Sequence, residues 1–322
     1  MKTLVSIPLV VLAVVAAILA FAAPRRPPPL PAIEWVNDRL AGALADLPPI
    51  ETLAVAGAAP IAWRVYEGEP GRGWILLVHG SSGHSVVVHL LARALRAAGF
   101  TVWSIDLRGH GASGPLGDID RVGRLEDDVA ALLDEAERRR PGERRLMIGH
   151  SLGGGFALRI AAGPLANRFD AHLALAPFVA ADFPGTRPGS GGWADVSLAR
   201  IVLLTVFDRF GLTAFDHLPV IAFAVPDDAI PPRTPFYSHR LLENASFPRD
   251  WKQALRRIER PTRVMIGAGD ELFDAVLYRR AFADAAPAIA VDLRPNATHM
   301  GLIVDDGAVA AVVATAGRML AR

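Results

Sequence analysis

The chain has 322 residues, of which 52% are hydrophobic and 21% are charged, and its formal net charge at pH 7 is +1. This length is sufficient for one large globular core or two small ones, and a nearly neutral balance without a long run of one sign argues against a nucleic-acid-binding surface. The sequence contains no cysteine, which excludes disulfides, thiolate zinc sites and a cysteine nucleophile.

The N-terminal segment 3–23 is uncharged and almost wholly apolar. As a helix it would be about 30 Å long, which is the thickness of the hydrocarbon core of a bilayer. We expect residues 1–23 to be a membrane-spanning signal anchor or a secretory signal peptide cleaved near 20–22. Both alternatives would export the rest of the chain to the periplasmic or extracellular side. Positive charge flanks both ends of the segment, beginning with Lys2, so the sequence leaves its orientation open.

A proline-rich stretch follows the apolar segment. Five prolines lie between residues 24 and 31, and such a sequence predicts a stiff, extended spacer. We therefore assign residues 24–50 to a Pro-rich linker and residues 51–322 to a folded domain. The abundance of Ala, Arg, Pro and Gly is typical of a GC-rich bacterial source.

The folded domain alternates predicted strands with predicted helices. Short apolar or alternating runs predict strands at 52–55, 61–66, 74–78, 101–107, 145–148, 172–176, 263–266 and 289–293. Helical periodicity predicts helices at 86–98, 125–139, 152–162, 272–285 and 308–320. The alternation implies an α/β fold with a mostly parallel central sheet that helices cover on both faces.

The stretch 180–260 interrupts this alternation. It is rich in Pro and Gly near 184–192 and strongly apolar at 201–207 and 220–225. Because it lies between two predicted sheet strands, we interpret it as an insertion within the domain. Open α/β sheets bind ligands at the carboxyl ends of their strands, so we expect the insertion to be a lid over that edge.

Ser151 lies in the pentapeptide Gly-His-Ser-Leu-Gly at 149–153, between a predicted strand and a predicted helix. Small residues beside the serine let the chain turn sharply, and the hydroxyl then projects from the turn, as in the Gly-x-Ser-x-Gly nucleophile elbow of serine hydrolases. The motif predicts Ser151 as the nucleophile of an acyl-transfer reaction.

A serine nucleophile needs a base that takes its proton and a carboxylate that orients the base. Asp270 ends a glycine turn after one predicted strand, and His299 follows the last predicted strand. Both positions fall at the sheet edge where Ser151 lies, in the order serine, acid, histidine, so Asp270 is the predicted acid and His299 the predicted base. Three other acids are alternatives for the acid: Asp182, Glu271 and Asp274.

Acyl transfer also requires hydrogen-bond donors for the oxyanion that develops on the carbonyl oxygen. The backbone amide of Leu152, directly after the nucleophile, is one predicted donor. The second is the amide of Ser81, in the loop after the strand predicted at 74–78, where Gly80 permits a turn that directs this amide inward.

Jointly, these segments resemble the α/β-hydrolase superfamily and, within it, the serine-aminopeptidase and monoglyceride-lipase-like branch. The matching motifs are HGSSGHS at 79–85, DLRGHG at 106–111, GHSLGG at 149–154, GAGD at 267–270 and NATH at 296–299. The resemblance covers about 52–322 and is weakest across the insertion. It implies Ser151 as nucleophile, Asp270 as acid, His299 as base, and an esterase, lipase or lysophospholipase activity without a cofactor.

The sequence therefore predicts an exported or membrane-anchored serine hydrolase that cleaves a small-molecule or lipid carboxylic ester through a covalent acyl-enzyme. The same triad could serve a peptidase, a thioesterase or an acyltransferase, and a non-catalytic binding protein of this fold is an alternative of another class. No zincin spacing, dinucleotide fingerprint or P-loop occurs. We expect the motif at 106–111 to shape a loop, and His79 and His150 to make structural hydrogen bonds.

Overall fold

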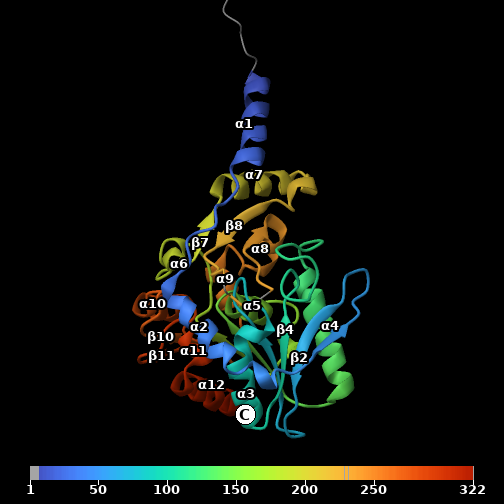
Figure 1. Cartoon of the computed structure of the whole chain (residues 1–322), viewed down its shortest axis with the longest axis vertical. Coiled ribbons are helices and arrows are strands. Elements are labelled where there is room, and N and C mark those ends of the chain that lie inside the picture. Colours follow the sequence, from blue (N-terminus) through green and yellow to red (C-terminus); the bar gives the residue numbers. More distant parts are fainter. Residues whose placement is uncertain (1–6, 228, 231, 322) are drawn as a thin grey trace, which may run out of the picture.

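The computed structural model of the chain describes residues 7–227, 229–230 and 232–321. Its centre is an eight-stranded sheet with the strand order β1-β2-β4-β3-β5-β6-β10-β11 (Figure 1). The β1–β2 and β2–β4 pairs are antiparallel, and all other pairs in this sheet are parallel. The prediction of an α/β fold with a mostly parallel central sheet is confirmed.

The strands of the large sheet lie within a few residues of their predicted positions. They are β1 (Ile50–Leu53), β2 (Ile61–Tyr66), β3 (Trp74–Val78), β4 (Thr101–Asp106), β5 (Arg145–His150), β6 (Ala171–Leu175), β10 (Thr262–Gly267) and β11 (Ala290–Arg294). Every residue of β3, β4 and β6 is buried, because these central strands are covered on both faces. The residues of the edge strand β11 are only partly buried or exposed.

Helices follow the strands along the chain and cover the sheet. They are α3 (His89–Ala97), α4 (Arg124–Arg139), α5 (Leu152–Ala161), α10 (Ala275–Ala285), α11 (Gly301–Val304) and α12 (Asp306–Leu320), with 3-10 turns η2 (Ser85–Val88) and η3 (Ala166–Arg168). Helix α5 packs against β5 and β6, α10 against β11, and α3 against α12. The short helix α11, which directly follows His299, was not predicted.

The topology brings four loops to one edge of the sheet. The parallel strands β3, β5, β10 and β11 end at the same edge, and the loops that leave them carry Ser81, Ser151, Asp270 and His299 respectively. Residues that are far apart in the sequence therefore share one end of the molecule.

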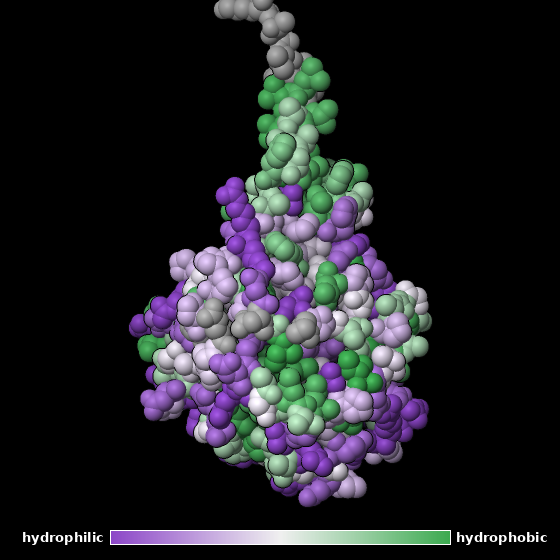
Figure 2. All heavy atoms as spheres, viewed as in Figure 1, coloured by the Kyte–Doolittle hydropathy of each residue, from purple (hydrophilic) through white to green (hydrophobic). Residues whose placement is uncertain are grey.

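Helix α1 (Ile7–Phe21) extends away from the body of the molecule (Figure 1). Its side chains are largely exposed and apolar, and Figure 2 shows them as a hydrophobic surface that continues toward the insertion. It has 15 residues, about 22 Å at the usual rise per residue. Within the described part of the chain, no helix is long and apolar enough to cross a membrane. The membrane-spanning helix predicted over residues 1–23 is thus not supported. Residues 1–6 of that segment lie outside the residues that the structure describes.

The stretch that follows contains structure that was not predicted. Helix α2 (Pro31–Ala41) begins with a proline at its first turn, where a missing backbone N–H costs no hydrogen bond. Its Val36 and Leu40 are buried in the main core, and α2 contacts α11. A 3-10 turn η1 (Leu44–Asp46) leads to β1. Much of the predicted linker 24–50 thus packs on the folded domain.

The insertion, residues 180–260, contains a second, three-stranded antiparallel sheet in the order β7-β8-β9. Its elements are α6 (Gly189–Gly192), β7 (Ala194–Val196), α7 (Leu198–Arg209), η4 (Thr213–Phe215), β8 (Pro219–Phe223), β9 (Phe236–Ser238), α8 (His239–Ala245) and α9 (Trp251–Arg256). Helix α7 contacts α1, and the Arg200 guanidinium donates to the backbone carbonyl of Leu19 at 2.6 Å. The insertion therefore contacts both the N-terminal helix and, as described next, the loops at the sheet edge.

Candidate active site

Ser151 occupies a sharp turn between β5 and α5. Its backbone has φ 56° and ψ −119°, a conformation that residues with a side chain rarely adopt. The neighbouring glycines are required by close packing: a Cβ at Gly149 would lie 2.0 Å from the carbonyl oxygen of Gly153, and one at Gly153 would lie 2.3 Å from that of His79. The Ser151 N–H donates to the carbonyl of Leu175 at 2.9 Å. The geometry is that of a nucleophile elbow.

His299 and Asp270 form a buried pair at the same edge. The Nδ1 of His299 lies 2.8 Å from Oδ2 of Asp270, and the two side chains are 2% and 0% exposed. Because a carboxylate accepts the Nδ1 proton, the other ring nitrogen, Nε2, is left as the acceptor in the neutral ring. The ring of Phe273 packs edge-on against the imidazole, with the ring centroids 5.3 Å apart. This pair has the orientation that a general base requires.

Asp270 is held by backbone amides as well as by the imidazole. Its second oxygen, Oδ1, accepts hydrogen bonds from the N–H groups of Leu272 and Phe273, each at 2.9 Å. One carboxylate oxygen is thus fixed by the turn, and the other is directed at His299.

The three alternative acids lie elsewhere. The carboxylate of Glu271 accepts the backbone N–H of His299 at 2.8 Å and so helps to place the loop, but it does not contact the ring. Asp274 caps the first turn of α10. Asp182 is exposed, in the turn that begins the insertion. Of the acids that sequence analysis left open, Asp270 is the one that contacts the imidazole.

Ser151 and His299 line a single cavity. The space that a water-sized sphere can occupy inside it is about 40 Å³, enough for a small group but not for a long acyl chain. Its walls come from α2, the loops at the sheet edge and the insertion: Val36, Asn37, Gly80, Ser81, Gly83, Val87, His150, Ser151, Trp193, Val225, Pro226, Arg233, Leu272, His299 and Met300. Among the described residues, the Ser151 hydroxyl has no recorded hydrogen bond, and such bonds commonly tighten only when substrate binds.

The predicted oxyanion donors border this cavity. The loop after β3 passes directly against the nucleophile, since a Cβ at Gly80 would lie 3.0 Å from that of Ser151. The backbone N–H groups of Ser81 and Leu152 have no recorded acceptor within the described chain. Two amides beside the nucleophile are therefore available to a substrate oxygen.

The loop after β3 is fixed in part by Tyr237, a residue that sequence analysis did not single out. Ser82 has a positive φ of 61°, and its N–H donates to the Tyr237 hydroxyl at 2.9 Å. That hydroxyl also lies 2.6 Å from Nε2 of His110. Tyr237 belongs to β9 of the insertion, so the insertion stabilises the loop that carries Ser81.

Buried histidines around the site make structural hydrogen bonds, as predicted for His79 and His150. The ring of His79 bonds to the carbonyl of Gly80 at 2.7 Å, and that of His150 to the carbonyl of His299 at 3.0 Å. Burial lowers the pKa of His79, His110 and His150 to about 3, so all three are neutral at physiological pH.

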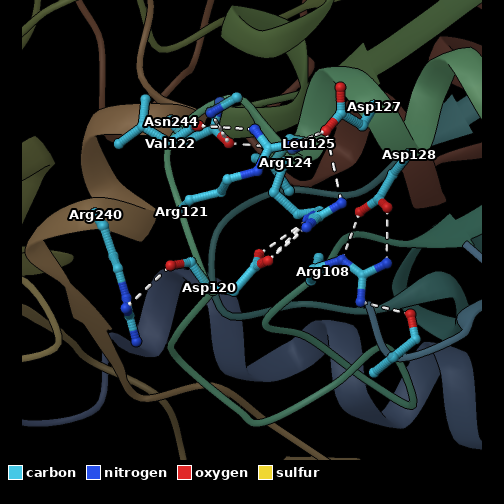
Figure 3. Close-up of polar contacts among 12 residues, drawn as sticks. Arg108, Asp120, Arg121, Val122, Arg124, Leu125, Asp127, Asp128, Arg240 and Asn244 are labelled. Atoms are coloured by element: carbon cyan, nitrogen blue, oxygen red, sulfur yellow. Dashed lines mark hydrogen bonds and ion pairs between the residues drawn. The ribbon is translucent and has the colours of Figure 1, made fainter. Parts of the chain in front are cut away.

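The motif at 106–111 shapes a loop, as predicted. The carboxylate of Asp106 accepts the backbone N–H groups of Ser85 at 2.7 Å and Ala112 at 2.9 Å. Arg108 makes a buried, bidentate ion pair with Asp128, with both bonds at 2.7 Å (Figure 3). These side chains therefore satisfy one another and the backbone.

One group of side chains in the described part of the chain could geometrically hold a metal ion: Asp208, Asp216 and His239, whose ligand atoms lie within 4.8 Å of one another. The Nδ1 of His239 already lies 3.3 Å from Asp216 and 3.6 Å from Asp208. None of the three is among the described residues that line the cavity of Ser151 and His299.

The polar or charged side chains of Asn37, Trp193 and Arg233 also line the cavity and were not predicted. The indole N–H of Trp193 donates to the Ser81 hydroxyl at 2.8 Å, which ties the insertion to the predicted oxyanion loop. Asn37 lies on the unpredicted helix α2, and the other two lie in the insertion. No motif marks them, because their placement depends on tertiary packing.

Comparisons with known proteins agree with the fold and the motifs. The sequence model of the serine aminopeptidase S33 family matches residues 69–305, so the chain belongs to this α/β-hydrolase family. The probable esterase PIR7A of Oryza sativa subsp. indica is 34% identical over 133 residues, 41% of this chain and 48% of that protein. The monoacylglycerol lipase of Mycolicibacterium smegmatis is 28% identical over 144 residues, 40% and 50% of the two chains. The chain thus spans about half the length of the curated relatives it matches.

Solved structures extend the similarity over the whole fold. The crystal structure of the Paleococcus ferrophilus monoacylglycerol lipase aligns with a TM-score of 0.60 at 21% identity, covering 80% of this chain and 99% of that one. A soluble variant of the monoglyceride lipase from Saccharomyces cerevisiae aligns with a TM-score of 0.61 at 18% identity, covering 86% and 96%. At these identities the alignments show the shared fold.

Proposed function

We propose that this protein is a carboxylic ester hydrolase that uses Ser151, His299 and Asp270 as a catalytic triad. The observation that carries the proposal is the shared cavity: the elbow serine and the imidazole of a buried His–Asp pair both line it. Similarity to a probable esterase and to a monoacylglycerol lipase supports an ester as the substrate.

The proposed reaction has two halves. In the first, the Ser151 oxygen attacks the ester carbonyl while Nε2 of His299 takes the hydroxyl proton, and the amides of Ser81 and Leu152 stabilise the oxyanion. The carbon–oxygen bond to the alcohol then breaks, and His299 returns the proton to the departing alcohol. In the second, His299 deprotonates a water molecule that attacks the acyl-serine, which releases the carboxylic acid and restores the hydroxyl.

We further propose that the insertion acts as a lid. Trp193, Val225 and Pro226 cover the cavity from the insertion side, and the bond from Trp193 to Ser81 would have to break for the lid to move. The small free volume supports movement of this kind, since a substrate larger than a few atoms requires a wider cavity.

The test is the Ser151→Ala variant with a reactive probe. We expect turnover of p-nitrophenyl butyrate to fall by about 10³-fold or more, because the covalent route is lost. A fluorophosphonate should label the parent at Ser151 and fail to label the variant, whereas Ser246→Ala, outside the cavity, should behave as the parent. Full turnover by Ser151→Ala, or labelling elsewhere, would contradict the triad. An aminoacyl amide and a thioester in the same assay separate esterase from peptidase and thioesterase activity.

The location of the protein stays a prediction from the sequence. The apolar sequence of residues 1–23 predicts export or membrane anchoring. Within this segment, residues 7–21 form the largely exposed, apolar helix α1. Residues 51–322 remain the proposed hydrolase domain.

A further inference from the structure

Arg233 is a positively charged residue of the candidate cavity. It lies between β8 and β9 of the insertion and lines the same cavity as Ser151 and His299. Within the described part of the chain it takes part in no ion pair. Its recorded hydrogen bond is a long one of 3.4 Å, from Nη2 to Oδ1 of Asn37. Its Nε is buried and has no hydrogen-bond partner among the described residues.

The arginines with fully buried side chains are satisfied, whereas the side chain of Arg233 is partly buried. Arg108 is paired with Asp128 and Arg124 with Asp120 (Figure 3). Arg200 donates to the backbone carbonyls of Pro219 and Leu19 at 2.9 and 2.6 Å. A buried polar group without a partner is costly, and most are hydrogen-bonded. Arg64 also has a buried Nε without a partner among the described residues, but it donates from Nη1 to the carbonyl of Pro48 and lies away from the cavity. Of these two arginines, Arg233 is the one at the candidate site.

The guanidinium nevertheless keeps its charge. Burial lowers the pKa of Arg233 to about 10, which still leaves it protonated at neutral pH. Among the described residues that line the cavity none is acidic, and Asp270 lies behind His299 rather than in the wall. The cavity thus presents one fixed positive charge and the Asn37 amide, with largely apolar walls on either side.

We infer that Arg233 binds an anionic group of the substrate, a carboxylate or a phosphate placed close to the scissile ester. Guanidinium groups bind both anions through paired N–H donors, and a site shielded from water strengthens the interaction. Because Arg233 and Ser151 line the same cavity, an anion bound to the guanidinium shares that cavity with the ester carbonyl. Asn37 provides a second, neutral donor. This inference rests on the proposed ester hydrolysis and names its substrate class.

The experiment compares matched neutral and anionic esters. On the acyl side, p-nitrophenyl valerate is compared with mono-p-nitrophenyl glutarate, which ends in a carboxylate. On the alcohol side, monobutyrin is compared with butyrylglycerol 3-phosphate. We expect the parent protein to favour the anionic member of at least one pair by tenfold or more in kcat/KM, and the pair that shows this preference distinguishes carboxylate from phosphate.

Two variants assign that preference to Arg233. Arg233→Met removes the charge while keeping the length, so the preference should fall to within about twofold, mainly through a higher KM for the anionic ester, and kcat/KM should fall more for the anionic ester than for the neutral one. Arg233→Lys should restore part of it, because a lysine keeps the charge but not the paired donors. Arg249→Met, at an exposed arginine paired with Glu243, should behave as the parent.

The outcomes separate this inference from the proposed function. Equal kcat/KM for neutral and anionic esters in the parent, or an equal loss on both in Arg233→Met, would overturn the role of Arg233 and leave ester hydrolysis standing. Failure of the parent to turn over any ester, with no fluorophosphonate labelling, would overturn the proposed function itself. The melting temperature of Arg233→Met should equal or exceed that of the parent, since the variant removes a partly buried charge that has no acidic partner among the described residues.

Discussion

The proposed chemistry depends on how individual side chains are held. Asp270 illustrates this, because each of its two oxygens has a separate task. Oδ1 accepts two backbone N–H groups and fixes the carboxylate, while Oδ2 accepts the Nδ1 proton of His299. An asparagine at this position has one accepting oxygen, which can accept either the backbone N–H groups or the Nδ1 proton of His299. Its NH₂ group cannot accept a hydrogen bond from the imidazole.

Asp270→Asn is therefore expected to lower kcat sharply with little effect on folding. We expect a loss of about 10³- to 10⁴-fold in kcat, since the imidazole loses both its orientation and the charge that stabilises its protonated form. Initial rates with a saturating neutral ester measure this effect.

Asp274→Asn is the matched control, only four residues along the chain. Asp274 accepts the N–H groups of Val276 and Leu277 at the start of α10 through Oδ1, and the asparagine oxygen can accept the same bonds, so both stability and kcat should stay close to those of the parent. If Asp270→Asn kept kcat within tenfold of the parent, or if both variants lost activity equally, Asp270 would not be the catalytic acid.

At the scale of the elements, the elbow depends on glycine for steric reasons. A Cβ at Gly149 would meet the Gly153 carbonyl at 2.0 Å, and backbone is an obstacle that cannot rotate away. We expect Gly149→Ala to lower stability by about 3 kcal/mol and to abolish ester turnover, because the β5–α5 turn must open.

Gly307→Ala is the matched control, and it is expected to have the opposite effect on stability. Gly307 lies in α12 with nothing within 4 Å of an added Cβ, so alanine should raise stability by about 0.5–1 kcal/mol and leave turnover unchanged. Urea unfolding and ester turnover measured on both variants test the pair. A Gly149→Ala protein as stable and active as the parent would show that the elbow tolerates a side chain.

The strands and helices of the main sheet could be predicted from the sequence. For the insertion, the sequence indicated its place in the chain but not the strands and helices inside it. Strands such as β3 are buried on both faces and therefore read as continuous apolar runs between turn residues. The insertion lacks such a signal, since its three short strands pair only with one another and have three to five residues. Helix α2 was missed because Pro31 was interpreted as part of a spacer, although proline is also common at a helix start.

The same division holds for the candidate site. Ser151, Asp270 and His299 could be placed because each follows a recognisable strand, and the carboxyl ends of parallel strands share an edge. The choice of Asp270 over its neighbour Glu271 required coordinates, since adjacent residues on a turn point in different directions. Arg233 had no sequence signal, because its position in the cavity depends on the packing of the insertion against the sheet edge.

At the scale of the whole molecule, neutral histidines are distributed through the core. Burial lowers the pKa to about 3 for His79, His110, His150 and His172. In the unfolded chain the same rings titrate near 6.5, so between pH 3 and 6.5 the unfolded state binds more protons than the folded state. Stability from these groups is complete above pH 6.5 and is lost as the pH falls toward 3.

The protein should therefore be markedly less stable in weak acid. Each of the four rings contributes about 1 kcal/mol of lost stability between pH 7.5 and 5.5. His172 tests this most directly, because it is buried in β6 and neither ring nitrogen has a recorded partner. His172→Leu removes one titrating ring and two unsatisfied nitrogens, so its urea midpoint should change less between the two pH values than that of the parent. His217→Gln, at an exposed histidine, is the control and should show the same change in urea midpoint between the two pH values as the parent. If His172→Leu also showed the same change as the parent, burial of the His172 ring would not contribute to the loss of stability in acid.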